Sequence, residues 1–130
     1  VPWDGNENSK LASQRYGFET GDVPFDRTYR RASNLDDMHE NGAHDYLKFV
    51  KFGYGRCTDH ASKDIRSGVM TRAEGIDLVR RYDPTKPSDI KRWLEYVEMS
   101  EEEFDAIADT FRDPRVWWYE DGWKKHDIEK

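Results

Sequence analysis

The chain has 130 residues, enough for one domain with a modest core, and its 35% hydrophobic and 37% charged residues indicate a thin core under a charged surface. The net charge of −6 argues against a general nucleic-acid or anionic-membrane surface. No apolar run approaches the roughly 20 residues of a membrane span. An aromatic content of 14% excludes a typical disordered chain. The single cysteine excludes an intramolecular disulfide and fits a reducing compartment, so we expect a cytoplasmic protein.

Residues 1–33 predict an irregular N-terminal segment with one short helix. That helix is expected over Asn8–Tyr16, with Gly17 as its stop. Residues 18–33 show little periodicity and predict a long loop, which is often functional or packed against the rest of the protein. The loop contains Arg27–Arg31 (RTYRR), which we interpret as a solvated stretch, with contact to an anion as the alternative.

Residues 34–113 predict a helical core domain. Asn34 is a candidate N-cap before an acidic first turn, and Gly42 is expected to interrupt that helix. Residues 43–52 then place apolar side chains at helical spacings, which indicates a buried face: Tyr46, Leu47, Phe49 and Val50. Thr58 is the next candidate cap, and it opens a helix that is expected to end near Gly68 and to bury Cys57, Ala61 and Ile65.

Two capping boxes predict further helices in this core domain. Thr71 with Glu74, and Ser100 with Glu103, each place a hydroxyl and a glutamate three residues apart at a helix start. Between these two helices, Ser88 is expected to cap a third, after the stop at Asp83-Pro84. The predicted apolar faces are Ile76, Val79 and Tyr82; then Ile90, Trp93, Leu94 and Val97; then Phe104, Ile107, Ala108 and Phe111.

Residues 114–130 predict a hairpin-like tail. Val116–Tyr119 reads as a strand, Asp121-Gly122 as a turn, and Trp123 as the start of a second strand. A two-stranded hairpin is marginal alone, so its tryptophans should pack on the helices or on a partner. The fold class is therefore mainly α, a small helical array with a short C-terminal β-hairpin.

The stretch Lys51–Gly68 (KFGYGRCTDHASKDIRSG) concentrates the residues able to carry chemistry. His60 and Asp64 lie four apart, hence on one helix face, where a carboxylate can orient an imidazole and raise its basicity. Cations and two glycines precede them, and such a segment before a helix start can contact a phosphate or carboxylate. The alternative is an ordinary surface ion pair or a hydrogen bond that braces the helix.

Other chemistries have weaker support. A metal site could use His39, His44, Asp45, His60 and Asp64, but their spacing matches no zinc motif, and we expect no bound metal. Cys57 lies on an inward stripe and is expected to be a packed thiol rather than a nucleophile.

The run KFGYGRCTDHASKDIRSGVMTRAEGIDLVRRYD resembles the C-terminal region of bacterial N-acetyl sugar amidotransferases, ATP-pyrophosphatase enzymes of surface-polysaccharide and nonulosonic acid biosynthesis. The resemblance is strongest over Tyr46–Asp83. It implies a C-terminal part of a larger α/β enzyme that converts a sugar acetamido group to an acetamidino group. ATP, with Mg²⁺, would activate the amide oxygen by adenylylation, and ammonia from a partner glutaminase would then displace AMP.

The family's Ser-Gly-Gly-x-Asp-Ser pyrophosphate loop does not occur in these residues, so we expect a fragment that is inactive without its nucleotide-binding domain. On this resemblance the expected ligand is a nucleotide sugar. The implied catalytic residues are His60 and Asp64, in substrate positioning or proton handling. The implied substrate-binding residues are Lys51, Arg56, Thr58, Asp59 and Arg66, of which Lys51 and Arg56 would contact a phosphate or sugar carboxylate. The alternative function is a helical module that docks a glutaminase or synthetase partner.

Overall fold

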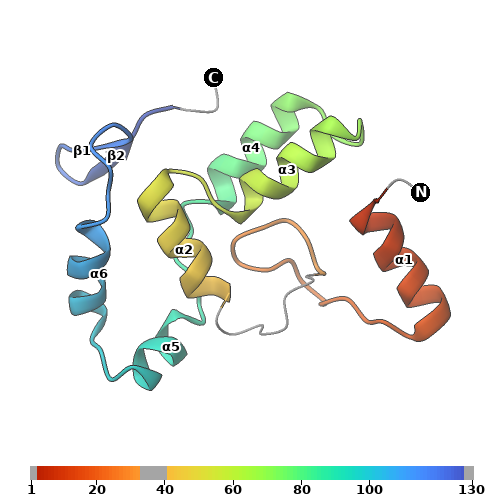
Figure 1. The fold of residues 1–130 in the computed structure, drawn as a ribbon, viewed down its shortest axis with the longest axis horizontal. Coiled ribbons are helices and arrows are strands. Elements are labelled where there is room, and N and C mark those ends of the chain that lie inside the picture. The colour runs from red at the N-terminus through yellow and green to blue at the C-terminus, as the bar shows by residue number, and fades with distance from the viewer. Residues whose placement is uncertain (1–2, 33–40, 128–130) are drawn as a thin grey trace.

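The computed structural model describes residues 3–32 and 41–127, and over these the protein is mainly α-helical (Figure 1). The helices are α1 (Gly5–Tyr16), α2 (Asn41–Phe52), α3 (Arg56–Arg66), α4 (Arg72–Tyr82), α5 (Ile90–Tyr96) and α6 (Glu101–Asp109). The antiparallel hairpin consists of β1 (Trp117–Tyr119) and β2 (Trp123–Lys125). The predicted fold class is confirmed, whereas the helix start predicted at Asn34 lies outside the described residues.

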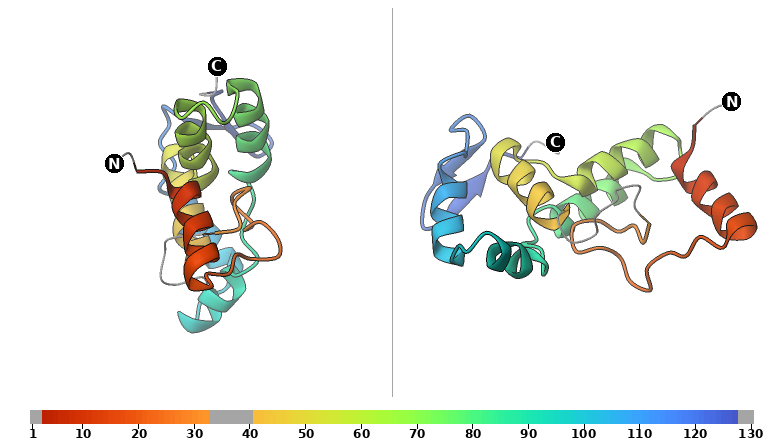
Figure 2. Two further views of the ribbon diagram at one scale, coloured as in Figure 1. Left: turned by 90° about the vertical axis from the view of Figure 1, so that its right-hand side faces the viewer. Right: turned by 60° about the horizontal axis from the view of Figure 1, so that its bottom comes forward.

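Two apolar clusters form the core of the described part. The first joins α2, α5 and α6 through Ala43, Val50, Ile90, Leu94, Phe104 and Ala108. The second joins α3 and α4 through Cys57, Ala61 and Val79, with Tyr29 of the preceding loop packed against it. Figures 1 and 2 show α3 and α4 side by side, with the hairpin at one end of the molecule and α1 at the other. The molecule is therefore elongated, with α1 apart from both apolar clusters.

Local capping signals set several helix ends as predicted. Both capping boxes form, at Thr71 with Glu74 and at Ser100 with Glu103. Gly17 ends α1 in the left-handed conformation, with φ of 68°. The α1 start was wrong by three residues, because the Asp4 carboxylate accepts hydrogen bonds from the Asn6 and Glu7 amides and caps the helix earlier.

Other predicted ends and faces are wrong. Ser88 does not cap α5, because Asp89 occupies the cap position. The Ser88 amide donates to the Asp26 carboxylate instead. Gly42 lies inside the first turn of α2, where a Cβ would overlap the Asp89 side chain, so it permits a close approach. The apolar faces were predicted too wide, because Val97, Ile107 and Phe111 are exposed.

The hairpin packs on the helices through one tryptophan. Trp117 is 5% exposed and meets Phe49 of α2 edge to face, with ring centroids 5.3 Å apart. Gly53, with φ of 76°, follows α2 and lies close to Val116 and Lys125. A Cβ at this position would overlap the Val116 side chain. The packing predicted for the tail is confirmed for Trp117, while Trp118 and Trp123 stay more than one third exposed.

A buried polar network lies between the two apolar clusters. The Arg27 guanidinium donates to the main-chain oxygens of Asp83, Thr85 and Asp45, and Arg56 forms a two-point ion pair with the Asp45 carboxylate. Arg27 is 3% exposed. The solvated loop that we favoured for Arg27–Arg31 is therefore wrong at Arg27, because main-chain oxygens of this chain bond to both terminal nitrogens of the guanidinium.

The cap of α3 also differs from the prediction. Gly55 occupies the cap position, and the capping group is the carboxylate of Asp83, which follows α4. It accepts from the amides of Gly55 at 2.8 Å and Cys57 at 3.0 Å, and from the Thr58 hydroxyl. Thr58 is thus not the cap, because a residue 25 positions away supplies the oxygen.

Candidate functional site

The predicted site residues divide between two surfaces and the interior. His60, Asp64 and Arg66 line a pocket between α1, the 18–32 loop and α3, here called the α1–α3 pocket. Thr58, Asp59 and Arg66 line a second, more open hollow on α3, which shares Lys63 and Arg66 with the first. The Arg56 guanidinium is paired with the Asp45 carboxylate. Lys51 lies at the end of α2, with its ammonium 5.2 Å from the Phe52 ring centre. The structure therefore brings together only part of the predicted set.

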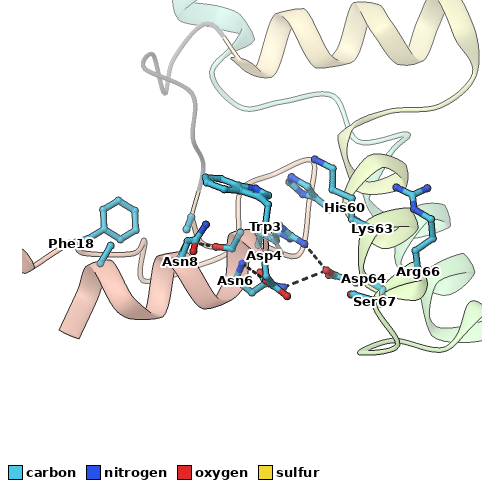
Figure 3. Close-up of a pocket in the computed structure, with 15 residues that line it drawn as sticks. Trp3, Asp4, Asn6, Asn8, Phe18, His60, Lys63, Asp64, Arg66 and Ser67 are labelled. Atoms are coloured by element: carbon cyan, nitrogen blue, oxygen red, sulfur yellow. Dashed lines mark hydrogen bonds and ion pairs between the residues drawn. The ribbon is translucent and has the colours of Figure 1, made fainter. Parts of the chain in front are cut away.

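The α1–α3 pocket has a volume of about 720 Å³, within the range typical of small-molecule sites. Figure 3 shows its two walls, with Trp3, Asn6 and Asn8 on the α1 side and His60, Lys63 and Asp64 on the α3 side. Arg30 and Ala32 of the loop also line it. Helical periodicity explains the α3 side, because residues 60, 63, 64 and 67 recur on one face.

Asp64 forms the centre of the pocket's wall. The residue is 6% exposed, and its carboxylate accepts from Arg30 at 2.6 Å, from Asn6 at 3.3 Å (Figure 3) and from the Tyr29 hydroxyl. Burial first, and then the bond to Asp64, raise the pKa of the Tyr29 hydroxyl above its ordinary value, so Tyr29 is a neutral donor. Asp64 thus holds α1, the loop and α3 together.

His60 has a different partner from the one that its spacing suggests. Its Nδ1 lies 2.7 Å from Oγ1 of Thr28, while the hydrogen bonds of Asp64 go to α1 and the loop. Burial, together with the nearby cations Arg30, Arg56 and Lys63, lowers the pKa of His60 to about 4, and Asp59 opposes this only weakly. The imidazole is therefore neutral at pH 7.

The exposed charges on the α3 side of the pocket are cationic, whereas Asp4 lines the α1 side. Lys63 and Arg66 are exposed on α3, and one Arg66 nitrogen donates to Ser62 Oγ at 2.9 Å. The Nε of Arg30 is buried and has no hydrogen-bond partner among the described residues. This wall therefore offers mainly N–H donors and suits a ligand rich in oxygen.

Neither a metal site nor a reactive thiol finds support among the described residues. Among the described residues, no group of three or more histidine, cysteine or acidic side chains could hold a metal ion, and His39 lies outside them. Cys57 is fully buried, and burial first and Asp83 second raise its pKa to about 12, as a packed thiol requires. Its predicted inward orientation is confirmed.

Sequence reasoning missed the residues that build the pocket from the loop. Thr28, Tyr29 and Arg30 were visible only as an Arg-rich aromatic run with a possible anion contact, and the anion that Arg30 meets is Asp64 of this chain. Asn6 gave no signal, and Asp83 was visible only as part of a helix stop, because each acts on an element distant in sequence.

The sequence was compared with models of known protein families. The model for "LPS biosynthesis protein WbpG-like, C-terminal domain" matches residues 14–128. The chain belongs to this family. A search of curated proteins finds no match. The WbpG-like match includes the loop and α3, which carry Arg30, His60 and Asp64, whereas the α1 residues that line the pocket precede residue 14. None of the described helices is long and apolar enough to cross a membrane.

Proposed function

We propose that this WbpG-like domain forms the sugar-nucleotide side of an ATP-dependent N-acetyl sugar amidotransferase of lipopolysaccharide biosynthesis. The observation that carries the proposal is the α1–α3 pocket, a concave site of ligand size whose wall presents Arg30, Lys63 and Arg66. Its α3 side lies in the segment that resembles such enzymes and within the match to a lipopolysaccharide biosynthesis family.

In the proposed reaction, the acetamido oxygen of the sugar attacks the α-phosphorus of ATP, and pyrophosphate leaves. Ammonia from a partner glutaminase then adds to the activated carbon, and AMP departs with the oxygen, which leaves an acetamidino group. The 130 residues contain no Ser-Gly-Gly-x-Asp-Ser loop, so we assign ATP and Mg²⁺ to a nucleotide-binding domain outside them. The part of this chain is to bind and orient the nucleotide sugar.

The α3 side chains have distinct roles in this proposal. Lys63 and Arg66 contact the diphosphate, since both are cations at the rim of the pocket. His60 lies on the same wall and orients a sugar or phosphate oxygen. Asp64 keeps Arg30 and α1 in place, and its three donors make it a positioning group. Lys51 and Arg56 have no place at this pocket, and a role for them in ligand contact stays a prediction.

The test is a titration of the isotopically labelled chain with a UDP-N-acetyl sugar, followed by amide chemical shifts. Shifts concentrated at residues 30–32 and 60–67 are expected. Lys63→Ala and Arg66→Ala should each weaken binding about tenfold, the loss of roughly 1.4 kcal/mol. Lys91→Ala is the control, because Lys91 is an exposed helical lysine on α5, outside the pocket. Equal weakening by the control, or no shift in these ranges, would refute the proposal.

A second candidate is a helical module that docks the glutaminase itself. It is favoured by exposed aromatic side chains on and beside the hairpin: Phe111, Trp118, Tyr119 and Trp123. Aromatic residues are enriched at protein interfaces, where they supply most of the binding energy. If the nucleotide sugar leaves the spectrum unchanged while a glutaminase shifts residues 111–123, this candidate replaces the first.

A further inference from the structure

Thr28 is a buried hydroxyl residue in the 18–32 loop that contacts the neutral histidine of the pocket. It is 1% exposed, and its Oγ1 lies 2.7 Å from Nδ1 of His60, which belongs to α3. The Tyr29 ring stands edge-on to the imidazole, with centroids 6.4 Å apart. The imidazole is therefore held by two consecutive loop residues, and only one of them bonds to a ring nitrogen.

The hydrogen-bond inventory of Thr28 decides the direction of that bond. A hydroxyl has one proton to donate and two lone pairs that accept. One lone pair faces the Arg30 amide, whose nitrogen lies 3.4 Å away. Among the described residues, Nδ1 of His60 is the acceptor within reach of the hydroxyl proton. A buried donor without an acceptor costs about 1–3 kcal/mol, so the hydroxyl donates to Nδ1.

The state of the ring follows from this direction. An Nδ1 that accepts a hydrogen bond carries no proton, and a neutral imidazole then holds its single proton on Nε2. The surrounding charges agree, because Arg30, Arg56 and Lys63 oppose a positive ring. Asp59 favours a positive ring, but it is already paired with Lys48. Tyr29 and Asp64 bond to each other rather than to the ring.

We propose that Thr28 is a positioning residue that fixes His60 as a neutral imidazole, with Nδ1 accepting from Thr28 and Nε2–H available to the pocket. His60 lines the pocket, its ring lies on the side of α3 that faces α1 (Figure 3), and no described residue bonds to Nε2. His60 is thus a hydrogen-bond donor to a carbonyl or phosphoryl oxygen and not a general base. The identity of that oxygen rests on the proposed function, whereas the tautomer does not.

The experiment measures the imidazole nitrogens of the ¹⁵N-labelled chain by long-range proton–nitrogen correlation at pH 7. His60 should show an unprotonated Nδ1 and a protonated Nε2, with its signals assigned by their loss in His60→Gln. The exposed His44 and His126 give reference signals in the same spectrum. A protonated Nδ1, or a doubly protonated ring, overturns the inference.

The role of Thr28 is tested by substitutions of nearly equal shape. Thr28→Val removes the hydroxyl and should shift His60 toward a mixture of tautomers, and Thr28→Ser should restore the wild-type pattern. A wild-type pattern in folded Thr28→Val overturns the assignment to Thr28. If that variant does not fold, a slowly exchanging Thr28 hydroxyl proton with a cross-peak to the imidazole supports the bond in the wild-type chain, and a rapidly exchanging one counts against it.

Adding a UDP-N-acetyl sugar separates this inference from the proposed function. If the sugar binds, the Nε2–H resonance should move while Nδ1 stays unprotonated, and loss of the Nε2 proton would overturn the donor role. If the sugar does not bind, the proposed function fails, and the spectrum of the free chain still decides the tautomer.

Discussion

Replacing Asp83 should destabilise the protein more than any other single carboxylate change that we consider. Asp83 is 1% exposed, and its carboxylate accepts from the Gly55 and Cys57 amides and from the Thr58 hydroxyl. The Arg27 guanidinium donates to its main-chain oxygen at 2.6 Å. Asp83→Ala would remove the cap of α3, leave three donors without their acceptor, and take a negative charge from beside a buried arginine.

The magnitude follows from those losses. A lost cap costs about 1 kcal/mol and each donor left buried about 1–3 kcal/mol. Arg27 also loses the favourable charge of the nearby Asp83 carboxylate. These costs overlap, because water can enter and the helix start can relax, so we expect about 3–5 kcal/mol for Asp83→Ala. Asp83→Asn keeps one acceptor oxygen and should cost about 2 kcal/mol.

Urea unfolding followed by tryptophan fluorescence measures the effect. With a slope of about 2 kcal/mol per molar urea, Asp83→Ala should lower the midpoint by roughly 2 M. Asp77→Ala is the matched control, because Asp77 is exposed on α4 and should change stability by no more than about 0.5 kcal/mol. A loss below about 1 kcal/mol for Asp83→Ala, or an equal loss for the control, would refute the capping argument.

Three further predictions follow from the same contacts. The pKa of His60 is about 4 in the folded protein and about 6.5 in the unfolded chain. Between these values the unfolded state binds more protons, so the protein loses stability as the pH falls from about 6.5 toward about 4. Urea unfolding at pH 7 and pH 5 should show a loss on the order of 1 kcal/mol that His60→Gln abolishes; an unchanged loss in that variant would contradict the cause. Gly53→Ala should cost about 1–2 kcal/mol more in thermal or urea unfolding than Gly68→Ala, since both have positive φ but only Gly53 meets Val116, and equal costs would count against the packing of the hairpin on α2. Cys57 should resist a thiol reagent at pH 8 in the native protein and react at once in denaturant; rapid native reaction would show that the site opens.

What the sequence determined by itself are the features whose causes lie within a few residues. Thr71 and Ser100 each bond to a glutamate three positions along, Gly17 supplies the left-handed conformation after α1, and Asp121-Gly122 turns the hairpin. Such contacts form wherever the local chain can reach them, so their spacing is visible in a single sequence.

Only the tertiary structure decided the contacts between distant residues. The capping group of α3 is Asp83, the anion that meets Arg30 is Asp64, and the partner of His60 is Thr28, at separations of 26, 34 and 32 residues. The spacing of His60 and Asp64 correctly placed both on one helix face, which forms a wall of the pocket. It could not show that side chains of the loop donate hydrogen bonds to the Asp64 carboxylate. A buried charge takes whichever partner the packing of the elements brings within reach, and that packing is decided by the whole chain rather than by the neighbouring residues.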